Sequence, residues 1–564
     1  MKNLVFTAFA IIGMTSIALA GPADEALDKA QALFDKGDFQ DAATTAAEGL
    51  KTDPEHFKLL RISGQIQLEL GQHGQALEFF EKALGQKSKD IETLYGAGMS
   101  ALKIGEYNKA AEYFQRGLDR KKQARFYYGL GMAQTELGNY SEADLNLRKA
   151  IDKEETVAEY HLALAEENYR YKVYPIAINE FKKAVELDST LEKTVPDLYY
   201  KIGESYLNLQ NILQAIFYYK KGLELFPDDI VAWKKLARIC EVANKPADAV
   251  YCIENVVRIA PDDGEWWFKL AGNYLNIKNR EKATESYEKA IGLDYNVAES
   301  FGQLALLYAD LDQYEKAWDA YTRYEATFGP PDSTLYWYEK GKVGIKLGSK
   351  NMAFFDSALY AFKKAIELDS TFSSSYEYAG LAYYFKRQYS NAIPYFKKKI
   401  ELDSTSVNSL RNLAFCLLKE ERYVEAAAML EKALVVKAED IQMRTMLGKI
   451  YSFNKKYDEA VQHFEILLND YSESLNDSIR CLIYPDLGLS YLSDGKCTKA
   501  TPVLLKAEQC NPNDISVLLN IATSYHTCNL IKEANTYYKK VLRIDPNNKD
   551  ATRGNLETTI QGQE

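Results

Sequence analysis

The chain has 564 residues, of which 47% are apolar and 26% are charged, an ordinary balance for a folded, water-soluble protein. Its 80 acidic and 69 basic residues give a formal net charge of −11. This charge argues against general nucleic-acid binding, which requires a basic surface. Length alone would suggest three or four globular domains.

Residues 1–20 differ in composition from everything that follows. Lys2 precedes an apolar run at 4–12, and Ala18-Leu19-Ala20 has the small-residue pattern of a cleavage site. We therefore expect a signal peptide that is removed after Ala20, and export to the periplasm or beyond by a bacterium. The alternative is an uncleaved membrane anchor. Since no other long apolar run exists, the mature chain is expected not to span a membrane.

The rest of the chain repeats at intervals of 34 residues, most plainly over 230–297. Two copies of one pattern lie back to back there, and small or apolar residues recur at matching places: Trp233, Leu236, Ala237, Cys240, Ala249 and Ile253 in the first copy, and Trp267, Leu270, Ala271, Tyr274, Ala283 and Tyr287 in the second. Each copy predicts two antiparallel amphipathic helices, called helix A (places 1–14) and helix B (about 17–30) here. Small residues such as Ala237 and Ala249 mark the closest approach of the two helix axes.

This period and these places resemble the tetratricopeptide repeat (TPR). The resemblance implies an all-α fold, a right-handed α-solenoid of about 15 stacked helix-turn-helix repeats that covers nearly the whole mature chain. Glycines at 37, 71, 105 and 138 recur between helices A and B, where a turn can require a positive φ. No segment of domain size is left for a separate catalytic module.

Two solenoid parts and a tail are expected along the chain. About nine repeats fill 21–330 and about six fill 331–548, and 549–564 form a C-terminal cap or tail. Gly329-Pro330-Pro331 separates the two parts, because this segment cannot continue a helix. It is the best candidate for a hinge. Short insertions are expected at 192–195, near 349–355 and at 471–478.

Seven cysteines in an exported chain raise the question of disulfides. The register of the TPR resemblance brings together the helix ends that carry Cys481 and Cys510, and those that carry Cys497 and Cys528. We expect these two bonds, while four unpaired thiols remain the alternative. The other three cysteines, Cys240, Cys252 and Cys416, are expected in the core.

Motifs of catalysis, metal binding and cofactor binding are missing from the sequence. The five histidines are scattered over different repeats, and the sequence contains no H-E-x-x-H, C-x-x-C, G-x-S-x-G or phosphate-binding glycine loop. The sequence therefore predicts a protein that is not an enzyme and that needs no cofactor or metal.

Helix A lines the inner groove of TPR-like solenoids, so its exposed places are candidate binding residues. The resemblance places two sets there: the apolar Tyr95, Met99, Tyr128 and Met132, and the basic Lys201, Lys234, Lys235, Arg238 and Lys269. The first set suits an apolar or helical ligand, and the second suits an acidic segment. Both could instead be solvated surface and packing between repeats.

Together these features favour a non-catalytic scaffold that binds protein or peptide partners of the bacterial cell envelope through its groove. The alternative is an envelope protein that binds glycan or peptidoglycan, with tyrosines as stacking platforms and cations for anionic groups. The sequence leaves the partner and the oligomeric state open.

Overall fold

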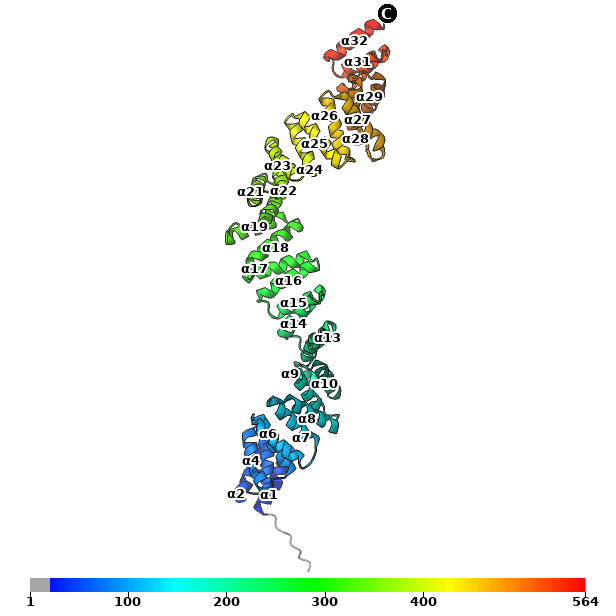
Figure 1. Cartoon of the computed structure of the whole chain (residues 1–564). Helices are drawn as coiled ribbons and strands as arrows, with labels where there is room; N and C mark the ends of the chain where they lie inside the picture. Colours follow the sequence, from blue (N-terminus) through cyan, green and yellow to red (C-terminus); the bar gives the residue numbers. More distant parts are fainter. Residues whose placement is uncertain (1–20, 563–564) are drawn as a thin grey trace, which may run out of the picture. The chain divides into compact units, whose positions relative to one another are not determined.

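A computed structural model of the chain describes residues 21–562, and the expected signal peptide lies outside this range. The described chain forms two compact units, one ending at Asn279 and the other beginning at Arg280. The helices of the first unit are α1 (Pro22–Lys36), α2 (Phe39–Thr52), α3 (Phe57–Glu69), α4 (His73–Gln86), α5 (Ile91–Lys103), α6 (Tyr107–Leu118), α7 (Ala124–Glu136), α8 (Tyr140–Lys153), α9 (Ala158–Arg170), α10 (Tyr174–Leu187), α11 (Leu191–Thr194), α12 (Leu198–Asn208), α13 (Ile212–Leu225), α14 (Ile230–Val242), α15 (Pro246–Ile259) and α16 (Gly264–Asn276) (Figure 1).

The second unit is also built of helices, and no strand occurs anywhere between residues 21 and 562. Its helices are α17 (Arg280–Gly292), α18 (Val297–Asp310), α19 (Tyr314–Phe328), α20 (Thr334–Gly348), α21 (Ala353–Leu368), α22 (Ser373–Phe385), α23 (Tyr389–Leu402), α24 (Val407–Lys419), α25 (Tyr423–Val436), α26 (Ile441–Phe453), α27 (Tyr457–Asp470), α28 (Asp477–Ser493), α29 (Cys497–Cys510), α30 (Ile515–Thr527), α31 (Ile531–Ile544) and α32 (Lys549–Gln561), with a short 3-10 turn η1 (Ser472–Ser474) before α28.

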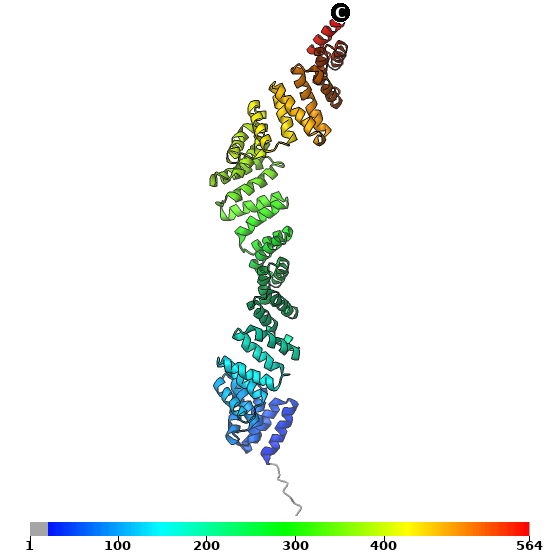
Figure 2. The ribbon, with the colours of Figure 1, turned by 45° about the vertical axis from the view of Figure 1, so that its right-hand side comes forward.

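Seven successive helix pairs form in each unit, while α16 ends the first unit and α17 begins the second; this order confirms the expected α-solenoid of about 15 repeats. The two remaining helices are α11, which occupies the expected insertion, and α32, which packs on α31 as a cap. Within each unit the pairs stack in chain order (Figure 2). The A helices of consecutive repeats also contact one another, as α5 contacts α7 and α26 contacts α28. None of the described helices combines the length and apolar character needed to cross a lipid bilayer.

Small residues at the helix A–helix B crossing allow the close approach that the sequence predicts. In the second unit, Gly380 packs against the ring of Phe396 and Gly448 packs against the ring of Phe464. A Cβ atom added at Gly448 would lie 2.7 Å from Cε1 of Phe464, and this ring is completely buried. The repeat therefore requires a small residue wherever an aromatic ring fills the crossing.

Tyrosines of helix A tie consecutive repeats together through hydrogen bonds. The hydroxyl of Tyr308 donates to Glu288 on the preceding helix, and Tyr451 donates in the same way to Glu431. Each tyrosine lies twenty residues beyond its glutamate, and both tyrosines are buried. A hydrogen bond to a carboxylate in such a site is stronger than one between neutral groups, so these contacts fix the spacing between repeats.

The segment at 329–331 is anchored to the repeat that follows it. The indole nitrogen of Trp337 donates to the carbonyl oxygen of Pro331 at 2.9 Å, as Trp233 does to Pro227 at 2.8 Å. This proline-rich segment thus takes part in a contact that recurs at other repeat junctions. The division expected after residue 330 falls inside the second unit, and a hinge at this point stays a prediction.

Candidate functional site

The apolar candidates of the first unit lie in the packing between repeats. Tyr95 on α5 packs edge-on against Phe126 at a ring-centroid distance of 5.7 Å, and Tyr128 on α7 lies 5.0 Å from Tyr160. Burial raises the pKa of both Tyr95 and Tyr128. All four candidates, Tyr95, Met99, Tyr128 and Met132, are half-buried against the neighbouring apolar cores. Only part of each side chain is therefore available to a ligand.

The basic candidates lie on α12, α14 and α16, and two of them, Lys201 and Lys235, pair with carboxylates of the preceding repeat. The ammonium group of Lys201 lies 2.7 Å from Glu166 of α9 and 3.0 Å from Asp197. Lys235 lies 3.6 Å from Glu204 of α12. In both cases an acid at place 9 of one helix A faces a lysine at place 6 of the next, and this spacing could have been found in the sequence. These residues form a ladder of ion pairs rather than a positive patch.

Two further lysines pair with acids near the start of α16. Lys234 lies 2.7 Å from Asp263, and Lys269 pairs with Glu265 one turn earlier on its own helix. Arg238 is exposed, and among the described residues no carboxylate lies within ion-pair distance of it. Arg238 occupies place 9, where the two preceding repeats carry Glu166 and Glu204. At place 9 of this repeat, the ladder of ion pairs therefore has a cation in the position that a carboxylate occupies in the two preceding repeats.

The indole of Trp266 is the point on which these cations converge. Lys234, Arg238 and Lys269 lie 5.4, 6.0 and 4.5 Å from the ring centroid, distances typical of cation–π contacts. Trp266 itself is only 2% exposed. The repeat pattern of the sequence singled out Trp267 instead, whose indole donates to the carbonyl of Pro261. Trp266 is therefore a residue of this surface that the sequence did not reveal.

Exposed valines flank the cationic part of α14. Val231, Lys235, Arg238 and Val242 follow one another at intervals of four, three and four residues, which places them along one face of the helix. Val231 is 63% exposed and Val242 is 80% exposed. We call these four residues the α14 stripe. The stripe offers an unneutralised guanidinium between two apolar contacts, an arrangement that suits a polypeptide segment carrying a carboxylate.

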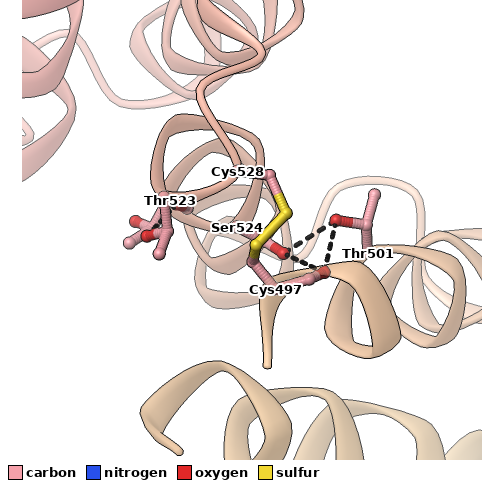
Figure 3. The surroundings of a disulfide bond; sticks show 6 residues. Cys497, Thr501, Thr523, Ser524 and Cys528 are labelled. Carbon is pink, nitrogen blue, oxygen red and sulfur yellow. Dashed lines mark hydrogen bonds between the residues drawn. A yellow bond between two sulfur atoms is a disulfide. The ribbon is translucent and has the colours of Figure 1, made fainter. Parts of the chain in front are cut away.

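In the second unit, the two cysteines of each pair expected from the sequence lie next to each other. Cys481 bonds to Cys510 with a Cα–Cα distance of 5.6 Å, and Cys497 bonds to Cys528 with a distance of 5.7 Å. Figure 3 shows the second bond beside Ser524. The other three cysteines, Cys240, Cys252 and Cys416, are buried thiols.

Within residues 21–562, no cluster of three or more histidine, cysteine, aspartate or glutamate side chains has an arrangement that could hold a metal ion.

Three known families match parts of the chain. Two families described as Tetratricopeptide repeat match residues 27–91 and 95–168, and residues 196–229, 265–297, 441–467 and 515–548. The family described as Anaphase-promoting complex, cyclosome, subunit 3 matches residues 351–433. These matches fall on both units and confirm the resemblance noted in the sequence.

Proteins from other organisms are similar to parts of this chain. The TPR repeat-containing protein MJ1428 of Methanocaldococcus jannaschii is 24% identical over 360 residues, covering 61% of this chain and 54% of its own. Tetratricopeptide repeat protein 8 of Caenorhabditis elegans is 22% identical over 34% of this chain and 37% of its own. The chain thus spans about half or less of these relatives. Among solved structures, the C-terminal part of a TPR repeat-containing protein from Cytophaga hutchinsonii covers 43% of this chain and 98% of its own, with 18% identity and a TM-score of 0.36.

Proposed function

Because the chain is built of tetratricopeptide repeats, we propose that it is a non-catalytic scaffold that binds a partner protein on the α14 stripe of its first unit. Repeats of this family present extended surfaces for protein–protein interaction. We further propose that the partners belong to the bacterial cell envelope, a proposal supported by the leader-like composition of residues 1–20.

The observation that carries this proposal is the position of Arg238. The other cations around it already pair with carboxylates of the chain, and Arg238 remains exposed beside the Trp266 ring. A partner carboxylate would complete the ladder at this place and form a charge-assisted hydrogen bond with the guanidinium. Binding there would not disrupt an existing ion pair.

The valines of the α14 stripe add a requirement for the partner. Val231 and Val242 lie on either side of Arg238 and expose most of their apolar surface to water. A partner segment that covers them gains the free energy of apolar burial. The segment is therefore expected to carry a carboxylate with apolar side chains on both sides of it.

The test uses the mature chain from Gly21 as bait for envelope extract, compared with the variant Arg238→Glu. Lys122→Glu is the matched control, since it makes the same charge change at an exposed position between α6 and α7. A partner held by the wild type and by Lys122→Glu, but bound at least tenfold more weakly by Arg238→Glu, supports the proposal.

Two other outcomes would count against this function. Equal capture by the wild type and by Arg238→Glu would show that the α14 stripe is not the site. Retention on purified cell-wall material, with no protein captured, would favour the alternative of glycan or peptidoglycan binding. Circular dichroism of each variant controls for unfolding.

A further inference from the structure

A second surface, with different chemistry, lies in the second unit on helices α24, α26 and α28. Two adjoining hollows of 490 and 380 Å³ open there, and Met446 and Lys449 line both of them. We call their joint surface the α26 groove. Its position on three consecutive A helices makes it continuous over three repeats, all within the second unit.

The lining of the α26 groove is mainly apolar and in part exposed. Leu418 and Leu489 line one hollow, and Ile479 lines the other. Phe453 and Leu482, one in each hollow, are 67% and 53% exposed. Side chains of this kind, gathered in a concave surface, are typical of an interaction site.

Most polar groups that line the groove already have an ion-pair or hydrogen-bond partner in the chain. The ammonium of Lys449 lies 3.6 Å from the carboxylate of Asp486, which cancels the only two charges of the lining. The hydroxyl of Thr445 donates to the carbonyl of Ile441 at 2.7 Å. The hydroxyl of Ser452 accepts from Ser490 at 3.2 Å.

Two polar groups of the lining remain available to a ligand, the Tyr423 hydroxyl and the exposed Gln442 amide. An extended peptide presents an N–H and a C=O group at nearly every residue, and burying these groups without partners is costly. The walls of the groove are helices, whose own backbone groups are already bonded, so they offer no strand edge. An α-helix avoids this cost because its backbone hydrogen bonds are internal.

We propose that the α26 groove binds one amphipathic α-helix of a partner protein through an uncharged apolar stripe of that helix. The helix places side chains one turn apart into the two hollows that meet at Met446. Phe453 and Leu482 become covered in the complex. This site lies in the second unit, so it does not depend on the α14 stripe.

The Cys481–Cys510 bond holds one wall of this groove. Cys481 lies between the lining residues Ile479 and Leu482 on α28, and its bond ties this end of α28 to the end of α29. The Cys497–Cys528 bond joins the start of α29 to the end of α30, and neither of its cysteines lines the groove. The first bond positions the binding wall and the second provides a matched control.

The experiment selects ligands from two display libraries on the immobilised full mature chain. One library is an 18-residue helix scaffold randomised along one stripe, and the other is a flexible 18-residue peptide randomised at the same number of positions. We expect binders from the helix library, with uncharged apolar residues along the stripe. No binders, or binders from the flexible library alone, would overturn the proposal.

Variants then locate the site on the chain. Leu482→Glu is expected to weaken the selected helices at least tenfold, and Phe453→Asp provides a second, independent disruption. Val435→Glu makes the same kind of change at an 86% exposed position of α25 outside the groove, and should leave binding unchanged. Binding that survives both groove variants would refute the assignment. Binding of the selected helices should not change in the variant Arg238→Glu, and this distinguishes the result from the test of the α14 stripe.

The role of the disulfide is measured with the same helices. Replacing Cys481 and Cys510 by serine should weaken binding several-fold, while replacing Cys497 and Cys528 should have a smaller effect. An equal loss in the two double variants would show that the first bond acts only through general stability, and would overturn its role as a wall of the groove.

Discussion

Removing the Cys481–Cys510 cross-link should destabilise the C-terminal repeats by an amount that follows from the length of the closed loop. The two cysteines are 29 residues apart. The chain-entropy relation for a loop of this length gives roughly 3.5 kcal/mol at 25 °C. Since about 1.4 kcal/mol corresponds to a factor of ten, the opening equilibrium of α28 and α29 should shift by several hundred-fold in the double variant Cys481→Ser/Cys510→Ser.

Hydrogen exchange measured by mass spectrometry can detect this shift in the affected helices. Amide protection in α28 and α29 should fall several hundred-fold in the double variant. Protection in α5 and α6 should not change, because each repeat contacts only its neighbours and these helices belong to the other unit. The distant helices thus serve as an internal control.

A thiol count must accompany the exchange measurement. The sequence has seven cysteines, and the structure leaves three of them free, so the denatured protein should react at three thiols before reduction and at seven after it. Burial raises the pKa of the free Cys416 thiol to about 12, which keeps it unreactive in the native state. Seven thiols before reduction, or a loss of protection below tenfold, would refute the reasoning.

Two further predictions concern the second unit. Burial and the nearby Arg444 lower the pKa of the His463 imidazole below its usual 6.5. The unfolded chain therefore binds a proton at His463 more readily than the folded chain does. The stability contributed by neutral His463 is thus present above pH 6.5 and is lost as the pH falls from 6.5 toward the folded pKa. His463→Gln should therefore reduce the fall in the urea midpoint between pH 7.5 and 5.5, and an unchanged fall would contradict this. Gly448→Ala should cost about 1–3 kcal/mol because its Cβ would collide with Phe464. Gly302→Ala in α18, where a Cβ meets no atom within 4 Å, should instead be neutral or stabilising in the same urea titration, and equal effects of the two changes would contradict the packing argument.

Much of the fold could be predicted because each repeat must bury the same face against the next. Small residues such as Ala237 and Gly448 recur wherever two helices cross, and a period of this kind is visible without any structure. The turns were less predictable. Gly37 has a positive φ, as expected, but Lys172 and Asn244 adopt the same conformation in later repeats. Residue type alone does not reveal a conformation that the surrounding helices impose.

The candidate site could be predicted only in part. The sequence located the cations of α14 but missed the carboxylates that pair with two of them, because those acids lie on other helices: Glu204 on α12 pairs with Lys235, and Asp263 at the start of α16 pairs with Lys234. The spacing of Glu204 at place 9 and Lys235 at place 6 of the next repeat is visible in the sequence, but whether the two side chains meet depends on the distance between neighbouring A helices, which the sequence of one repeat does not specify. Trp266 was missed for a related reason: it lies outside the repeated pattern, and its burial arises from the stack.

Two of the three insertions, at 192–195 and 471–478, offer positions at which the chain could carry a label. Helix α11 is an insertion between two repeats, and α10 and α12 on either side of it still pack against each other. The turn at Ser472–Ser474 is a similar excursion, and its residues are not buried. A small fluorescent tag or an epitope placed in either segment would lengthen a loop that the stack already accommodates. A tag in each unit would then allow the distance between the two units to be measured in solution.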